Sequence, residues 1–321
     1  MNEGNISRDA LRAVFEATHS LPGVHSRTDE IMGGYGTITL VGGSDSLLAQ
    51  LWEEAQTCEG LWSRFLPGSD ISRLNWSEGK PLKVDPLTVE LIAAMREGAT
   101  LSEGTYDPTL LPDVLKMGYA ASTVDPHKVT TLPASAVAPG NLRGIHSEGN
   151  VVTLPVGTTL DPGGIGKGFL ADLIAQRALA GGAWGVMAEF GGDIVVDGQA
   201  PDGVAWRLGL EDPFTPDEHA AVIRLLRGGV VTSSQRKRRF GEGATTTHHL
   251  IDSTTHSSAQ SQVQTVTVIA ATGARAEVLT KRGFVDNPAD YLAWLPTVGA
   301  AGFLINEDGT QLTSANWSTY E

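Results

Sequence analysis

Asp161-Pro-Gly-Gly-Ile-Gly-Lys-Gly168 joins an apolar run at 151–160, VVTLPVGTTL, to a helical pattern at about 165–181. Glycines let the backbone turn tightly and approach a ligand, and a helix N-terminus offers N–H groups and partial positive charge. Lys167 adds a full charge, so the stretch suits a diphosphate. It is neither a Walker loop, because no Ser or Thr follows Lys167, nor the dinucleotide pattern GxGxxG. The alternative is an ordinary glycine-rich corner with a surface lysine.

The elements predicted around this corner do not alternate strictly between strand and helix. Helical patterns cover 8–18, 46–64, 85–102, 165–181, 274–284 and 289–295, with Asp45 and Asp85 as N-caps. Strand patterns cover 36–41, 184–190, 193–197, 204–210, 219–226, 229–233, 248–252, 264–270, 301–306 and 310–314. Residues 67–73 read as a polar turn, and 121–150 as an irregular excursion with short strands. This order favours an α+β fold over a doubly wound α/β fold.

Composition narrows the possible partners. The 321 residues carry 23 Lys and Arg against 37 Asp and Glu, a net charge of −14. This balance argues against a general nucleic-acid-binding protein, which needs a basic face to neutralise phosphates. A local anionic cofactor is still compatible with it, because backbone N–H groups and a few placed cations suffice.

Cysteine use and the chain start suggest a compartment. Cys58 is the single cysteine, so no intramolecular disulfide can form, and it reads as a small core residue. Met1–Val14 lacks the apolar run of a signal peptide, and no segment has the roughly 20 apolar residues of a membrane span. We therefore expect a cytoplasmic protein without membrane insertion.

Four shorter runs are weaker candidates for chemistry. In Gly104-Thr-Tyr-Asp107-Pro-Thr109, Asp107 and Thr109 suit a helix cap. Glu189–Asp193 suits a hairpin turn, and Thr232-Ser233-Ser234 is a polar strand end that faces phosphate or solvent. In His248-His249-Leu-Ile-Asp252, a His–Asp pair suits acid–base work, although ordinary polar contacts explain it equally well. The histidine spacing does not favour a zinc site.

The order of all these runs is more specific than any one of them. Together they resemble the FAD:protein FMN transferase (ApbE) family from about residue 30 to 315. The matching runs are Met32-Gly33, Ser69–Asn75 (SDISRLN), Tyr106–Thr109 (YDPT), Asp161–Gly168, Gly191–Asp193, Trp206–Pro213 (WRLGLEDP), Thr232-Ser233 and His249–Asp252 (HLID).

The resemblance implies a single two-lobed α+β unit over 31–321, with a T-fold-related core and antiparallel sheets flanked by helices. Residues 1–30 are expected to form an N-terminal extension with a helix. Family members cut the FAD pyrophosphate and join FMN through a phosphoester to a threonine of an acceptor protein, releasing AMP, with Mg²⁺ assisting.

Site residues follow from the same resemblance. Met32 and Phe65 are expected at the flavin, with Phe65 where many relatives have a stacking tyrosine. His249 is the candidate general base or else orders its loop, and Asp161 is the second catalytic candidate. The remaining expected contacts to FAD are Thr105, Tyr106, Asp107, Asp161, Lys167 and Leu250.

The expected Mg²⁺ ligands are the carbonyl of Gly164 and the side chains of Glu277 and Thr280. The family's metal-ligand helix reads roughly Asp-Ala-Leu-Ala-Thr, and the best register places Glu277 at the aspartate and Lys281 at the threonine. An ammonium cannot coordinate Mg²⁺. Either the register slips, with Thr280 as ligand and Ala276 at the aspartate position, or Lys281 supplies part of the metal's charge. A third interpretation is an ordinary i,i+4 pair of Glu277 and Lys281 on an exposed helix.

A second departure follows His249, where relatives continue Asp-Pro-x-Thr-Gly and this chain reads Asp252-Ser-Thr-Thr-His-Ser. The two departures leave three activities open. They are transfer of FMN to an acceptor protein, FAD binding without chemistry as a carrier or sensor, and hydrolysis of FAD to FMN and AMP.

Overall fold

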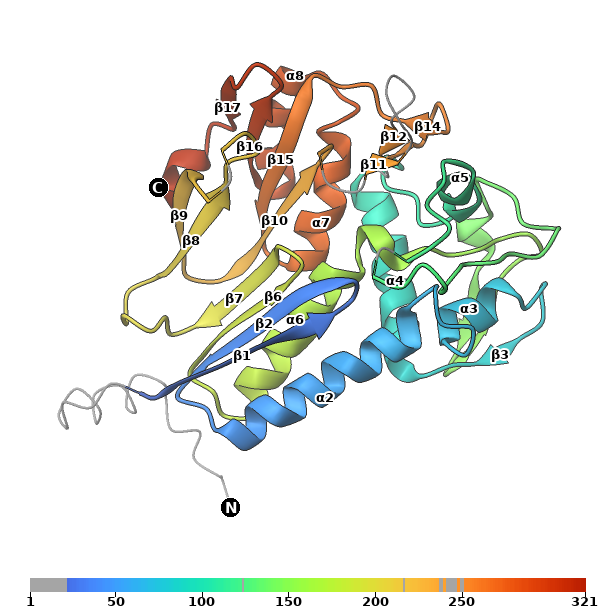
Figure 1. Cartoon of the computed structure of the whole chain (residues 1–321), viewed down its shortest axis with the longest axis horizontal. Coiled ribbons are helices and arrows are strands. Elements are labelled where there is room, and N and C mark those ends of the chain that lie inside the picture. The colour runs from blue at the N-terminus through green and yellow to red at the C-terminus, as the bar shows by residue number, and fades with distance from the viewer. Residues whose placement is uncertain (1–21, 123, 216, 237–238, 241–246, 249–250) are drawn as a thin grey trace.

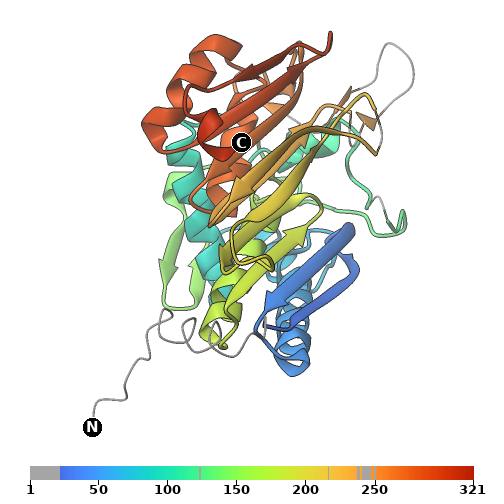
Figure 2. The same cartoon turned by 90° about the vertical axis from the view of Figure 1, so that its left-hand side faces the viewer.

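The fold is built on one large antiparallel sheet (Figure 1). The computed structural model describes residues 22–321 except 123, 216, 237–238, 241–246 and 249–250. In spatial order the strands are β1 (Val24–Ile31), β2 (Gly34–Val41), β6 (Gly185–Phe190), β7 (Asp193–Gly198), β10 (Gly228–Ser234), β15 (Val263–Ala270), β16 (Ala301–Asn306) and β17 (Gln311–Thr313). Figure 2 shows the blue β1–β2 hairpin at one end of this sheet and the red C-terminal strands at the other.

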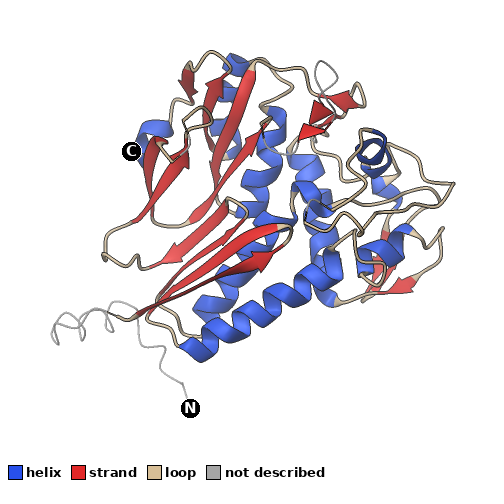
Figure 3. Ribbon diagram, viewed as in Figure 1, coloured by secondary structure: helices blue, strands red, loops and turns tan. Residues whose placement is uncertain are grey.

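Helices cover one face of the sheet, as the blue ribbons of Figure 3 show. Their bounds are α2 (Asp45–Trp62), α3 (Asp70–Asn75), α4 (Pro86–Leu101), α5 (Leu111–Lys116), α6 (Gly166–Ala180), α7 (Gly273–Arg282) and α8 (Pro288–Trp294). Short 3-10 turns are η1 (Leu142–Gly144), η2 (Pro162–Gly164), η4 (Leu295–Val298) and η5 (Trp317–Tyr320). The α+β class predicted from the sequence is confirmed.

Four small sheets complete the described part of the chain. They pair β3 (Leu82–Lys83), β5 (Val151–Thr153) and β4 (His146–Glu148); β8 (Trp206–Glu211) and β9 (His219–Leu225); β11 (Arg239–Phe240) and β12 (Thr247–His248); and β13 (Ile251–Asp252) and β14 (Ser257–Ser258). The β3–β5–β4 sheet lies with α3 and α5 in a smaller lobe beside α4 (Figure 1).

The main sheet lies between two apolar layers, which is why β15 is buried along its whole length. Successive strand residues point to opposite faces, so Val231 joins the core under the helices while Val230 joins the core under β8 and β9. On β16, Leu304 likewise joins the core under the helices, and Phe303 joins the core under β8 and β9. Burial on both faces explains why these strands read as continuous apolar runs.

Two predictions near the N-terminal half need correction. Residues 67–73 were expected as a polar turn, but α3 begins at Asp70, with the Ser69 hydroxyl accepting from the Ser72 N–H at 3.0 Å. Strand β1 begins inside the range 1–30 that was expected to form an extension and ends at Ile31, and its residues are too polar to indicate a strand. The helix predicted at 8–18 lies outside the described residues. In the described part of the chain, no helix combines the length and apolarity that crossing a bilayer requires.

Three glycines allow α6, α7 and β10 to meet backbone against backbone. A Cβ added at Gly168 would lie 2.5 Å from the carbonyl carbon and oxygen of Gly273. One added at Gly229 would lie 2.4 Å from the Gly273 nitrogen. Real Cβ atoms do not approach so closely, so side chains at these positions would force the elements apart. This glycine crossing sets the position of α7 relative to the 161–168 corner.

Candidate functional site

A hairpin turn forms one wall of the main cavity. Met32 and Gly33 connect β1 to β2 with φ angles of 50° and 76°. Two residues with positive φ between paired strands are typical of a type I′ turn, whose twist matches that of the strands. The Met32 N–H donates to Glu59 Oε1 at 2.7 Å, which ties the turn to α2. Met32 therefore has a left-handed backbone conformation at the wall of the cavity.

This cavity has a volume of about 570 Å³, a size typical of small-molecule sites. Four of the predicted site residues line it, namely Met32, Phe65, Asp161 and Lys167. Phe65 and Tyr119 supply aromatic walls, with ring centroids 6.0 Å apart. The structure thus brings together residues that are more than 130 positions apart in the sequence.

Arg64 is a cavity residue that the sequence did not single out. Its guanidinium is buried and lies 4.2 Å from the centroid of the Phe65 ring and 4.6 Å from that of Tyr119. Its Nη1 donates to Thr130 Oγ1 at 2.8 Å, and its Nε lies 3.5 Å from Asp161 Oδ1. Arg64 therefore fixes the aromatic wall and balances the charge of Asp161.

The 161–168 corner is a 3-10 turn followed directly by a helix. Asp161 caps η2 by accepting from the Gly163 N–H at 2.9 Å, and α6 begins at Gly166. The irregular segment before the corner is locked by Asn75, whose side chain donates to the Leu160 carbonyl at 2.9 Å and accepts its N–H at 2.7 Å. The predicted strand at 151–160 is thus limited to β5, Val151–Thr153. Asn75 belongs to the SDISRLN run, which thus positions the corner rather than forming part of the cavity wall.

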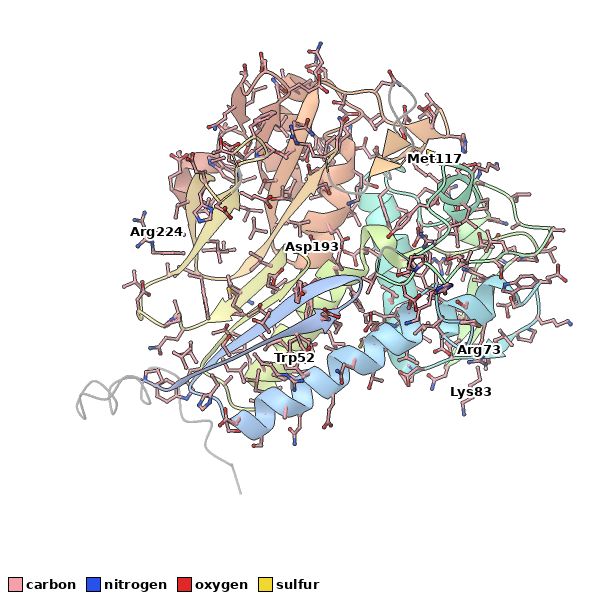
Figure 4. All side chains as sticks on the ribbon, in the orientation of Figure 1. Trp52, Arg73, Lys83, Met117, Asp193 and Arg224 are labelled. Atoms are coloured by element: carbon pink, nitrogen blue, oxygen red, sulfur yellow. The ribbon has the colours of Figure 1, made fainter. Side chains whose placement is uncertain are left out.

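Lys167 does not project into solvent as the corner-with-surface-lysine alternative requires. Its ammonium forms an ion pair with the buried carboxylate of Asp193 and lies 3.6 Å from Glu277 Oε1. Asp193 lies near the middle of the molecule (Figure 4). The Gly191–Asp193 run is therefore both a hairpin turn and the source of a counter-ion for Lys167.

A second, smaller cavity adjoins the first. It measures about 90 Å³ and shares Tyr119, Asp161 and Gly163 with the larger one. The remaining predicted residues on its wall are Thr105, Tyr106, Asp107 and Gly164, and Lys281 lies there as well. The expectation that Asp107 and Thr109 cap the next helix is wrong, because α5 begins at Leu111 and Asp107 instead accepts from the Thr109 N–H and hydroxyl.

Tyr106 carries a buried hydroxyl that has no hydrogen-bond partner within the described part of the chain. The residue is 5% exposed, and burial raises the pKa of its phenol well above the ordinary value, so the hydroxyl keeps its proton. A buried donor without a partner costs free energy unless a ligand satisfies it. Because Tyr106 lines the smaller cavity, its hydroxyl is a candidate group for contact with a polar part of a ligand.

Two of the expected Mg²⁺ ligands, Glu277 and Thr280, do not fit that ion. Of the Glu277 oxygens, Oε2 accepts from the Gly168 N–H at 2.9 Å and Oε1 faces Lys167. The buried Thr280 hydroxyl donates to the Glu277 carbonyl at 2.7 Å and lies 3.3 Å from the Lys281 ammonium. Mg²⁺ needs close, nearly octahedral oxygen ligands, and an ammonium at that distance would repel it. Among the described residues, no three His, Cys, Asp or Glu side chains are grouped to hold a metal.

Glu277 also rules out the exposed-helix interpretation of its pairing with Lys281. Its side chain is 2% exposed, and α7 turns it toward α6 instead of solvent. Burial raises the pKa of Glu277 above its ordinary value, while the positive charges of Lys167 and Lys281 oppose that rise. The negative charge of this buried carboxylate is thus stabilised by two lysines.

Of the predicted residues at the loop after β12, His249 and Leu250 lie outside the described residues. The Asp252 Oδ1 accepts from the Thr254 N–H at 2.8 Å and from the Thr254 hydroxyl, so this carboxylate caps its own turn. His256 pairs with Asp113 on α5, at 2.7 Å between Nδ1 and Oδ2. This pair joins the loop to the smaller lobe.

Asp172 on α6 makes the junction with α7 sensitive to pH. Its carboxylate accepts from the N–H groups of Gly273 and Ala274 at 2.7 and 2.9 Å, and burial raises its pKa to about 7. The folded pKa lies above the unfolded value of 3.8, so the folded state holds the proton more tightly. The stability that the protonated Asp172 carboxyl contributes is therefore fully present below about pH 4 and is lost as pH rises through 7.

We expect Asp172→Asn to remove this slope, even though it weakens the cap at every pH. Between pH 5 and pH 8 the wild type should lose on the order of 2–4 kcal/mol more than the variant. Urea unfolding at both pH values measures it. Asp290→Asn, at an exposed carboxylate on α8, is the control that should keep the wild-type slope. Parallel curves for wild type and Asp172→Asn would contradict the assignment.

Comparison with known protein families identifies the family of this chain. A model of the ApbE family matches residues 32–303, which spans both cavities and the glycine crossing. The chain belongs to the ApbE family. The corner, the hairpin turn and α7 all fall within the matched range.

Relatives in the ApbE family support the same placement. A protein of Vibrio cholerae named FAD:protein FMN transferase is 27% identical over 64% of this chain and 63% of its own length. One of the same name from Haemophilus influenzae is 27% identical over 70% of this chain and 67% of its own length. The chain thus aligns with about two thirds of these relatives.

Solved ApbE structures share the fold. The ApbE protein of Thermotoga maritima superposes with a TM-score of 0.80 at 24% identity, covering 93% of this chain and 99% of that one. The flavinyl transferase ApbE of Pseudomonas stutzeri gives 0.77 at 22% identity, covering 94% and 97%. The antiparallel sheet with its helical layer is therefore the ApbE fold.

Proposed function

We propose that this chain transfers the FMN half of FAD to a threonine hydroxyl of an acceptor protein and releases AMP. The observation that carries the proposal is the pair of cavities meeting at the 161–168 corner. A dinucleotide has two bulky halves joined at a diphosphate, and this site has two compartments joined at a glycine corner with a lysine. The activity also agrees with the names of the Vibrio and Haemophilus relatives.

The side chains that line each cavity offer groups suited to one half of FAD. In the larger cavity, Met32 and the aromatic wall of Phe65 and Tyr119 offer apolar faces to the isoalloxazine ring. In the smaller cavity, Thr105, Tyr106 and Asp107 offer polar groups to the adenosine side. We place the diphosphate between them, against the Gly163 backbone and the N-terminus of α6.

The transfer balances without a further reactant. The threonine Oγ attacks the phosphorus of the FMN half, a P–Oγ bond forms, and the bridging P–O bond breaks. AMP leaves with the bridging oxygen, and the hydroxyl proton passes to a base, which we assign to His249. Asp161 fixes the corner, and Lys167 contributes positive charge where negative charge develops.

The direct test is to incubate the purified protein with FAD and candidate acceptor proteins. We expect AMP release together with an acceptor mass increase equal to one FMN. AMP release without an acceptor would indicate hydrolysis instead, and FAD binding without AMP in any condition would indicate a carrier. No FAD binding by titration calorimetry would overturn the proposal.

Tyr106→Phe tests the adenosine side with two opposite effects. Removing a buried hydroxyl that has no partner among the described residues should raise the stability of the ligand-free protein by about 1 kcal/mol. The same change should weaken FAD binding about fivefold, because the ligand loses a hydrogen bond. Thermal unfolding and FAD titration measure the two effects separately.

Tyr291→Phe is the matched control for this variant. Tyr291 is equally buried, but its hydroxyl donates to the Leu279 carbonyl at 3.0 Å. Its loss should lower stability and leave FAD affinity unchanged. If Tyr106→Phe binds FAD as the wild type does, the Tyr106 hydroxyl does not contact the nucleotide.

A further inference from the structure

Lys281 occupies a fixed position on the wall of the smaller cavity. Its ammonium donates to the Ser233 hydroxyl on β10 at 3.0 Å and to the Thr280 hydroxyl on α7 at 3.3 Å. Those two hydroxyls are themselves 2.7 Å apart. A long lysine side chain usually loses rotamer freedom when it binds a ligand, and here that freedom is already restricted.

The ammonium also lies beside the glycine corner. A Cβ added at Gly164 would lie 3.5 Å from Lys281 Cε, and Asp161 lines the same cavity. This is the side of the corner on which the two compartments join. Positive charge at this point therefore faces the expected position of the diphosphate.

The charges around Glu277 complete the argument. Two ammonium groups act on this buried carboxylate, with Lys167 measured at 3.6 Å and Lys281 contributing from the other cavity. A divalent cation at Glu277 and Thr280 would have to displace or repel the ammonium beside Thr280. Both lysines thus place positive charge beside the residues at which the family resemblance predicted the metal.

We propose that the Lys281 ammonium takes the place of a divalent cation at the FAD diphosphate, so that FAD binding does not require Mg²⁺. This inference rests on the proposed function, because it assumes that FAD is the ligand. A lysine is a compact cation whose N–H groups bind phosphate oxygens, as a metal does, but without directional coordination. Its charge is smaller than that of a divalent cation, and Lys167 at the same corner is already paired with Asp193.

The test is FAD titration by calorimetry or fluorescence, in EDTA and in excess Mg²⁺. Wild-type affinity should agree within about twofold between the two conditions. Lys281→Met keeps the stem and removes the charge, so it should bind FAD about tenfold or more weakly in both. Lys281→Thr should bind weakly in EDTA and recover in Mg²⁺. Circular dichroism and thermal unfolding confirm that each variant is folded.

Lys83→Met and Lys83→Thr are matched controls. Lys83 is exposed and points outward from the smaller lobe (Figure 4), so its loss should leave FAD affinity unchanged in both conditions. Wild-type binding that requires Mg²⁺ would overturn the inference and leave the proposed function standing. Unchanged FAD affinity of Lys281→Met in EDTA, or the same Mg²⁺ response in Lys281→Thr as in the wild type, would also overturn it. If the wild type binds no FAD in either condition, both proposals fail.

Discussion

Replacing Lys167 with methionine should lower the free energy of unfolding by about 3–5 kcal/mol. The ammonium is the ion-pair partner of Asp193 and lies 3.6 Å from Glu277, and both carboxylates are almost fully buried. Without it, two buried carboxylates lose their shared counter-ion. The loss is large because desolvated charges are expensive to leave uncompensated.

The pH dependence of this variant gives an independent check. Removing Lys167 should raise the folded pKa of Glu277 still further above its unfolded value. The variant should then be closest to wild type in acid, where the carboxyls are protonated, and lose stability as pH rises. Denaturant unfolding at pH 5 and pH 8 measures this difference.

A double variant separates charge from packing. Lys167→Met with Asp193→Asn removes one uncompensated charge and should recover about 1 kcal/mol or more relative to Lys167→Met alone. Lys83→Met, at an exposed lysine, should be neutral within about 0.5 kcal/mol. Equal stability of the single and double variants would show that the ion pair is not what stabilises this region.

Gly168→Ala should be the second large effect, with a loss of about 3 kcal/mol or more. The added methyl would lie 2.5 Å from the Gly273 carbonyl and 2.9 Å from the Ala274 nitrogen, and neither backbone can move without moving α7. Because α7 carries Glu277 and Lys281, FAD affinity should fall along with stability. Chemical unfolding and FAD titration are the measurements.

Gly60→Ala is the control, because it places the same methyl group on a helix where nothing lies within 4 Å. At an open helical position alanine is the better helix former, so this variant should gain about 0.5–1 kcal/mol. If both variants behave alike, the cost at Gly168 is not steric. A Gly168→Ala protein with normal stability would show that α6 and α7 tolerate a wider separation.

The sequence predicted most elements because their signals are local. Asp85-Pro86 opens α4 as expected, with the Asp85 side chain accepting from the Leu87 N–H at 2.9 Å. The α2 cap was misplaced by one residue, since Ser44 rather than Asp45 caps it, and both residue types suit that role. Boundaries depend on which of two adjacent good caps the tertiary contacts select.

The site was predicted in part, through runs whose order resembles a known family. The sequence could not show which charged side chains contact one another in the fold. Arg64 lies in no matching run, and its burial against Phe65 depends on contacts with Thr130 and Tyr119, more than 50 residues away. Lys167 and Asp193 were both noted, but their pairing follows from the β6–β7 hairpin returning beside α6.

The meeting of Gly168, Gly229 and Gly273 has a consequence for how this protein can change over evolution. Because only backbone atoms meet at this crossing, no flexible side chain can move aside to accommodate a substitution. New ligand preferences must therefore arise elsewhere, from residues that can vary singly, such as Phe65 on one side and Tyr106 on the other. The corner proposed to bind the diphosphate would stay constant, while the walls of the two cavities diverge.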